Sequence, residues 1–313
     1  MISDIPTYDD FADQGTAFLN LAWDTVLDLL LDYEDAEAEE GIIDDEQPEE
    51  YWKAAIKPLA TAVALVHQGA EFHLKARIAL ISPYLLITSK ASEWPRKSDK
   101  QDTSFSSFYI ADAQNLIKIH DTVAEPRLSD TIKQLYEKLR LARNKIFHTV
   151  DKRLRFSEKE IIQAILEISD ELISPQKWTL IRRSYLESIP RSFVWTVHPV
   201  GSVLSREMMV VLDLLGAADA KKFFGFNKRQ RKYICPNCVS EHRELNIDEN
   251  PLTAQLSPNK PNSTNLFCFV CRENIPVIRK RCKNIDCKGN VIHEGRDFEC
   301  LTCFIDHEAD EIR

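Results

Sequence analysis

Residues 129–148 have the sequence SDTIKQLYEKLRLARNKIFH, and this stretch decides the fold class of most of the chain. Apolar side chains recur in it every three or four residues, at Ile132, Leu135, Leu139, Ala142 and Ile146. That period is typical of an amphipathic α-helix that buries one face. Ser129 or Asp130 can accept hydrogen bonds from the free amides of the first turn. We therefore predict a helix that begins beside these residues and packs against other helices.

Similar patterns lie on both sides of this stretch. One predicted helix runs from about Pro58 to Ile81, with the proline in its first turn. Another begins at the capping box formed by Ser157 and Glu160. Strand-like alternation is limited to a short apolar run at residues 193–197. The body of the chain is therefore predicted to be a helical bundle.

The composition indicates a globular protein. Of the 313 residues 44% are hydrophobic and 28% charged, so the chain can bury a sizeable core. No apolar run approaches the length that spans a bilayer, and the first residues lack the features of a secretory signal. We expect a cytoplasmic protein without a membrane partner.

The charge is distributed very unevenly. Residues 1–52 contain seventeen acidic side chains and no lysine or arginine. The other 261 residues carry all 40 basic residues and the remaining 32 of the 49 acidic ones, which gives them a net charge of +8. The acidic segment is either a solvated helical face or a cover for a basic surface. We predict three parts: an acidic helical segment (1–52), a helical domain (53–225) and a C-terminal region (226–313).

All cysteines lie in the C-terminal region and form four close pairs. They are Cys235 and Cys238, Cys268 and Cys271, Cys282 and Cys287, and Cys300 and Cys303. Two cysteines separated by two residues can direct both sulfurs of one turn to a single ion, and two such turns complete a tetrahedron. In a cytoplasmic protein this pattern indicates metal binding rather than disulfides. We predict two structural Zn²⁺ ions bound by these eight thiolates.

The pairing of these turns is open to two interpretations. Sequential use gives two zinc ribbons, whereas interleaved use joins the first pair to the third. Residues 272–281 have the character of a linker, which favours sequential ribbons. Because four thiolates fill each site, we expect no catalytic metal, and His242, His293 and His307 are poor candidates for ligands. The predicted fold class is mostly α, with a small β-rich zinc-ribbon region at the C-terminus.

Basic residues gather beside the cysteine pairs, interleaved with aromatic residues such as Phe224, Phe226 and Tyr233. Such a mixture suits a surface that binds phosphates and stacks bases, although solvated linker charge gives the same pattern. The candidate RNA-binding residues are Lys228, Arg229, Arg231, Lys232, Arg279, Lys280 and Arg281.

The helix predicted at 130–148 ends in a chemically distinctive group. Arg143, Asn144 and His148 provide a permanent cation, an amide and an imidazole that titrates near neutral pH. Asn144 and His148 lie four residues apart and share a helix face. Simple charge complementation at a helix C-terminus would also favour basic residues here.

The Arg143-x4-His148 pattern, with a polar residue directly after the arginine, resembles the active-site motif of the HEPN superfamily. The resemblance covers roughly residues 53–175 and includes the upstream segment with Glu71, Lys75 and Arg77. A second match, Arg191-x6-His198, lies in an ambiguous apolar run and is discounted.

This resemblance implies a HEPN-like helical bundle with a metal-independent endoribonuclease activity. It implies a homodimer in which two motif copies face each other, with tRNA or mRNA as substrate. It also implies products with a 2′,3′-cyclic phosphate or 3′-phosphate and a 5′-hydroxyl. Such proteins act as toxins or antiphage effectors, with an antitoxin or defence-system partner. HEPN toxins silenced by nucleotidylation carry a tyrosine two residues after the histidine, where this chain has Val150.

The same residues are also compatible with a different class of function. The chain would then be a non-catalytic scaffold whose zinc ribbons bind nucleic acid or protein.

Overall fold

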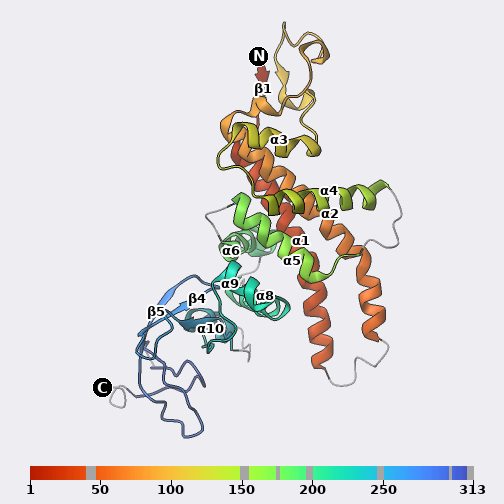
Figure 1. Cartoon of the computed structure of the whole chain (residues 1–313). Helices are drawn as coiled ribbons and strands as arrows, with labels where there is room; N and C mark the ends of the chain where they lie inside the picture. The colour runs from red at the N-terminus through yellow and green to blue at the C-terminus, as the bar shows by residue number, and fades with distance from the viewer. Residues whose placement is uncertain are drawn as a thin grey trace. The chain divides into compact units, whose positions relative to one another are not determined.

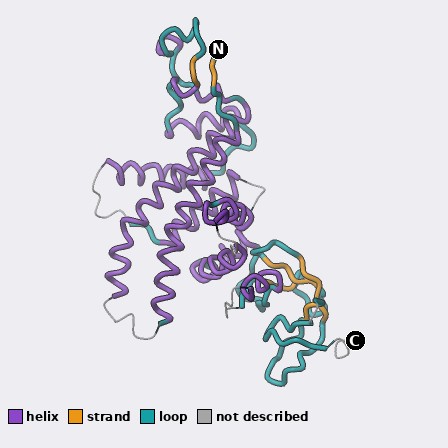
Figure 2. The backbone as a smooth tube through the Cα atoms, turned by 180° about the vertical axis from the view of Figure 1, so that it is seen from behind, coloured by secondary structure: helices purple, strands orange, loops and turns teal. Residues whose placement is uncertain are grey.

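The chain divides into two compact units, Met1–Gln176 and Lys177–Arg313, each described by itself (Figure 1). The computed structural model describes residues 1–39, 47–148, 155–173, 177–194, 200–244, 250–295 and 298–308. Helices dominate the described residues; one short strand pair lies near the N-terminus, and the other strands lie towards the C-terminus (Figure 2). The predicted fold class, mostly α with a small C-terminal β region, is confirmed. The division at residue 176 differs from the boundaries predicted after residues 52 and 225.

The first unit is a bundle built on two long helices. Its elements are β1 (Ile2–Ser3), α1 (Tyr8–Ala38), α2 (Gln47–Ile81), α3 (Ala113–Val123), α4 (Asp130–His148) and α5 (Glu158–Ile168), followed by a π-helical turn at Ser169–Ile173. The connection from α2 to α3 contains three short 3₁₀ turns, Pro83–Leu86, Ala91–Glu93 and Phe105–Ser107, and strand β2 (Thr103–Ser104), which pairs with β1 in parallel.

Helices α1 and α2 pack side by side over most of their length (Figure 1). They approach closely at two glycines: a Cβ atom added to Gly69 would lie 3.0 Å from the carbonyl oxygen of Gly15. Trp23 and Val26 of α1 are fully buried. Helix α1 is therefore part of the core, which argues against the acidic segment as a cover that detaches, because its removal would expose these side chains.

The predicted start of the second helix at Pro58 is wrong, because α2 begins at Gln47 and contains Pro58 in its interior. A proline inside a helix removes one backbone hydrogen bond. Contacts with α1 stabilise the helical turns that precede Pro58. The hydroxyl of Tyr51 donates to the carbonyl oxygen of Leu29 at 2.7 Å, and the ring of Tyr33 lies 5.4 Å from that of Trp52. Tertiary packing thus overrides the local signal.

Helices α3, α4 and α5 pack against α2 or against each other. Helix α4 begins at Asp130, as predicted, and buries Ile132, Tyr136, Leu139 and Ala142. The predicted capping box is confirmed at α5, where the hydroxyl of Ser157 accepts from the amide of Glu160. In the described part of the chain no helix is both long and apolar enough to cross a membrane.

The second unit begins with helices and ends with a small sheet. Its helices are α6 (Trp178–Ser188), α7 (Pro190–Val194), α8 (Val200–Leu214), α9 (Ala217–Phe224) and α10 (Pro236–Glu244). Helices α6 and α8 are joined by a buried ion pair in which the guanidinium of Arg182 donates to both carboxylate oxygens of Glu207, at 2.9 and 2.7 Å. Part of the run predicted as strand-like, up to Val194, is helical in α7.

The sheet has the order β3-β4-β5-β6, and its strand pairs are antiparallel. The strands are β3 (Ala254–Leu256), β4 (Asn265–Cys268), β5 (Asn274–Ile278) and β6 (Ile292–His293). Strand β5 occupies much of the segment predicted to be a linker, so the two cysteine groups share one sheet instead of being connected by a loop.

Candidate functional site

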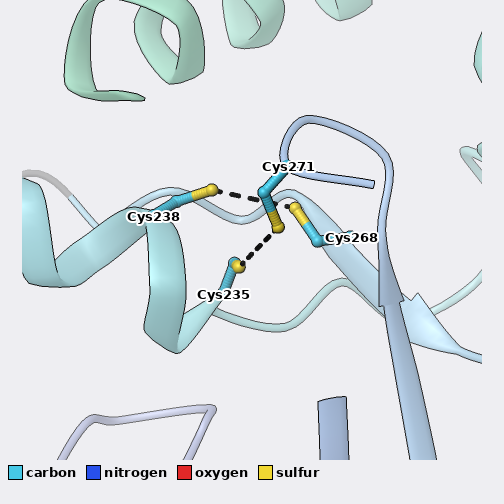
Figure 3. A group of neighbouring side chains, drawn as sticks. All are labelled: Cys235, Cys238, Cys268 and Cys271. Atoms are coloured by element: carbon cyan, nitrogen blue, oxygen red, sulfur yellow. Dashed lines mark hydrogen bonds between the residues drawn. The ribbon is translucent and has the colours of Figure 1, made fainter. Parts of the chain in front are cut away.

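The first four cysteines converge on one point between a helix and a strand (Figure 3). Cys235 and Cys238 lie at the start of α10, Cys268 ends β4, and Cys271 lies in the turn that follows. The Sγ atoms of Cys235 and Cys271 are 3.8 Å apart, as are those of Cys238 and Cys268. Without a cation, hydrogen bonds to the other three thiols and then burial raise the pKa of Cys235, an effect that a bound metal reverses.

The other four cysteines form a second group of the same kind. The Sγ atoms of Cys282 and Cys303 are 3.6 Å apart, and those of Cys287 and Cys300 are 3.9 Å apart. Gly289 is a site residue that the sequence did not single out. Its amide donates to Cys287 Sγ, and a Cβ atom there would lie 2.8 Å from Cys300 Sγ. Any side chain at this position would displace a ligand.

Both groups fit a tetrahedral metal ion. In each group the four sulfur atoms lie within 4.8 Å of one another. A tetrahedron with metal–sulfur bonds of about 2.3 Å has edges of about 3.8 Å, the separation found here. The two groups are thus positioned to bind metal ions, and the sequential pairing is confirmed.

The backbone ties the two groups into one body. The amide of Ile234 donates to the carbonyl oxygen of Leu301, beside Cys235 on one side and Cys300 on the other. Buried His307 serves the second group as a support instead of a ligand: its Nε2 accepts from the amide of Lys283, and its Nδ1 lies 3.0 Å from the carbonyl oxygen of Phe298. His293 pairs with Glu299, and the side chain of His242 lies outside the described residues.

The basic residues predicted to bind RNA occupy different environments. Lys228 donates to the carbonyl oxygens of Leu212 and Leu215, which stabilises the end of α8. The guanidinium of Arg231 contacts the backbone of Lys288 and the hydroxyl of Thr302.

The remaining five of these residues are half-buried or exposed. Lys232 is half-buried, and Arg229 is exposed before the first cysteine pair. Arg279 and Lys280 are half-buried and Arg281 is exposed, all three next to the second group.

Arg143, Asn144 and His148 lie at the C-terminal end of α4, as predicted. The Nη1 of Arg143 donates to the Oδ1 of Asn144 at 3.2 Å, and the guanidinium lies 5.8 Å from the ring centroid of Phe147. The imidazole of His148 is exposed and forms no hydrogen bond with a described residue. One chain therefore brings Arg143 and Asn144 together and leaves His148 open to solvent.

Arg143 differs from the other cations on this side of the bundle. Lys75 pairs with Glu71 at 2.6 Å, and Arg140 pairs with Glu137 at 2.7 Å. Among the described residues no carboxylate pairs with Arg143. Its charge is therefore available to an anionic ligand.

His67 is a second residue that the sequence analysis missed. It is completely buried in α2, with its ring 5.2 Å from that of Tyr136, and neither ring nitrogen has a hydrogen-bond partner among the described residues. Burial, with a smaller contribution from the charge of Arg143, lowers the pKa of His67 to about 4. Its position in the apolar stripe of α2 was the only signal in the sequence.

The discounted motif does not form a comparable group. Arg191 lies in the short helix α7, and His198 lies outside the described residues. Comparison of the whole chain with models of protein families, with curated proteins and with solved structures finds no match.

Proposed function

We propose that this protein is a metal-independent endoribonuclease of the HEPN type, in which Arg143 and His148 cleave RNA. The observation that carries the proposal is the end of α4, where Asn144 holds the guanidinium of Arg143 without a competing carboxylate and the imidazole of His148 faces solvent. The Arg143-x4-His148 motif supports the same assignment.

The residue types suit transesterification of RNA. His148 takes the proton from a ribose 2′-hydroxyl, the 2′-oxygen attacks the adjacent phosphorus, and the bond to the 5′-oxygen breaks. Arg143 donates to the phosphoryl oxygens and stabilises the charge that accumulates on them. The leaving 5′-oxygen receives a proton, so the products carry a 2′,3′-cyclic phosphate and a 5′-hydroxyl.

A homodimer supplies what one chain lacks. This reaction uses a general base and a general acid, whereas the end of α4 presents a single imidazole. Two copies whose α4 ends face each other would provide both, with Asn144 orienting the partner or the substrate. We place such a dimer with toxins or antiphage effectors that act on tRNA or mRNA and are controlled by an antitoxin or defence partner.

We further propose that each cysteine group binds one structural Zn²⁺. Four buried or half-buried thiolates at tetrahedral separations fit zinc and leave no open position for water or substrate. The metal would therefore fold the tail and take no part in the reaction.

The test is RNA cleavage by zinc-loaded protein, with analysis of the product ends. Arg143→Gln and His148→Ala should each lower the rate at least about 100-fold, the usual contribution of acid–base or charge-stabilising groups. Arg127→Gln, which removes an exposed arginine before α4, serves as the charge-matched control and should retain full activity. Equal cleavage by wild type and both site variants would refute the proposal.

The second candidate, a non-catalytic scaffold that binds nucleic acid or protein, is favoured by the closed cysteine groups. It predicts that purified protein binds RNA or a protein without cutting any RNA. Cleavage that depends on His148 would exclude this scaffold function.

A further inference from the structure

The second unit contains a hollow lined by aromatic and polar residues, here called the aromatic hollow. Phe224, Phe226, Phe267 and Phe269 line it, with Gln230 and Ser257 among the polar lining residues. It encloses about 340 Å³ of empty space, part of which is open solvent. No metal ligand lines it, although Phe267 and Phe269 flank Cys268 in the sequence, and nothing in the proposed reaction uses it.

Two segments far apart in the sequence supply the aromatic residues of this hollow. Phe224 ends α9 and Phe226 follows it, whereas Phe267 and Phe269 lie in and just after β4. The ring centroid of Phe269 lies 5.2 Å from that of Phe224 and 5.1 Å from that of Phe226, so three buried rings form the floor. Phe267 is half-exposed.

Gly225 keeps one part of the wall open. Its φ of +70° suits glycine and ends α9, and a Cβ atom added there would meet nothing within 4 Å. The open space is bordered by polar groups as well as rings, which suits a ligand with a flat apolar face and a polar edge.

Two cations flank the aromatic hollow. The guanidinium of Arg272 lies over the ring of Phe267, 4.9 Å from its centroid, and the ammonium of Lys232 lies 6.0 Å from the centroid of Phe226. No carboxylate among the described residues pairs with either one. Between Ala217 and Cys235 the chain has six basic residues and one acidic residue, Asp219. A ligand here should combine a flat aromatic part with negative charge.

We propose that the aromatic hollow binds one unpaired base of single-stranded RNA, while Arg272 and Lys232 contact the phosphates on either side. Every base has a flat face that stacks on aromatic rings, and the amide of Gln230 and the hydroxyl of Ser257 can donate to or accept from its edge. This inference rests on the proposed function only in its choice of RNA as the ligand, because binding here requires no cleavage.

The test compares two strands of eight nucleotides for binding to zinc-loaded full-length protein. One is 2′-O-methyl oligouridine, which cannot be cleaved, and the other has the same backbone without bases. Wild type should bind the strand with bases about tenfold more tightly, because stacking of one base contributes on this scale. Fluorescence anisotropy at fixed salt measures both affinities.

Three variants separate the contributions of stacking and charge. Phe267→Leu keeps apolar bulk but removes the π face, and Ser257→Tyr fills the hollow from its exposed rim; each should abolish the preference for bases and leave binding of the abasic strand unchanged. Arg272→Gln should weaken binding of both strands. The matched control, Lys288→Gln, removes one exposed charge beside the second cysteine group and should preserve the preference.

Equal affinity of wild type for the two strands would overturn the inference. So would a preference that survives in both Phe267→Leu and Ser257→Tyr while zinc content and circular dichroism show them to be folded. Competition by an acidic aromatic peptide, but not by uridine monophosphate, would assign the hollow to a protein ligand instead. Loss of cleavage in the Arg143 and His148 variants is measured separately, so either proposal can fail alone.

Discussion

The two units of this protein are stabilised by different means. The first buries large apolar side chains between long helices, as where Trp23 of α1 is fully buried in the bundle. The C-terminal part of the second has short strands and gathers eight cysteines around two points. We expect a segment with so few long elements to depend on bound metal ions for its stability, whereas the helical bundle depends on close packing. The comparison also separates the roles that we propose: metal binding in the C-terminal part of the second unit and RNA cleavage at the end of α4 in the first.

Metal removal should show the difference in stability between the two units most clearly. Structural zinc in small modules contributes on the order of 10 kcal/mol, so Cys268→Ser or a strong chelator should unfold the tail while α1 and α2 remain folded. Hydrogen exchange measures protection in each segment, and zinc release is measured with a colorimetric chelator. Equal loss of protection in both units would contradict the separation.

The buried ion pair between α6 and α8 should give the next largest effect. Arg182→Met removes the cation that pairs with the buried Glu207 carboxylate and should lower the free energy of unfolding by about 4 kcal/mol. Replacing both residues, Arg182→Met with Glu207→Leu, should restore most of that loss because neither charge of the pair is then buried. Denaturant titration of the single and double variants measures both values, and a double variant as unstable as the single one would contradict this explanation.

The contact between α1 and α2 can be tested at Gly69. Gly69→Ala places a methyl group 2.7 Å from the side chain of Leu19 and 3.0 Å from a backbone oxygen, and should cost about 2 kcal/mol. Gly216→Ala has room for the added atom, with its nearest neighbour at 3.7 Å, and provides the control. Equal stability of the two variants in thermal unfolding would show that the helices adjust freely.

The smallest predicted effect concerns pH. Burial lowers the pKa of both His67 and His73 from 6.5 to about 4. Between these values the unfolded chain binds more protons than the folded one, so stability falls as the pH is lowered below 6.5. From pH 7.5 to 5.5 each histidine should account for about 1.4 kcal/mol of this loss.

His67→Leu tests that assignment, because it should remove its share of the pH dependence of unfolding. The measurement stays above pH 5.5 so that protonation of the cysteine ligands, and with it metal loss, is limited. An unchanged slope would show that His67 is protonated or accessible in the folded state.

The sequence predicted those features that depend on local patterns. The stripe of α4 and the capping box at Ser157 follow from helical periodicity and backbone chemistry, and the cysteine groups follow from ligand spacing. The start of α2 could not be predicted, because contacts of Tyr51 with α1 outweigh the effect of Pro58. The clash at Gly289 and the aromatic hollow also depend on residues that only the fold brings together.

The most direct test of the account is to exchange the metal and measure RNA cleavage. Cd²⁺ also binds four thiolates, so protein loaded with Cd²⁺ should fold in the same way. If Arg143 and His148 carry the reaction, the zinc and cadmium forms should cleave cellular RNA at rates within about twofold of each other, and His148→Ala should be at least about 100-fold slower in both forms. A rate that follows the metal, cleavage that survives in His148→Ala, or no cleavage by either form would contradict the account.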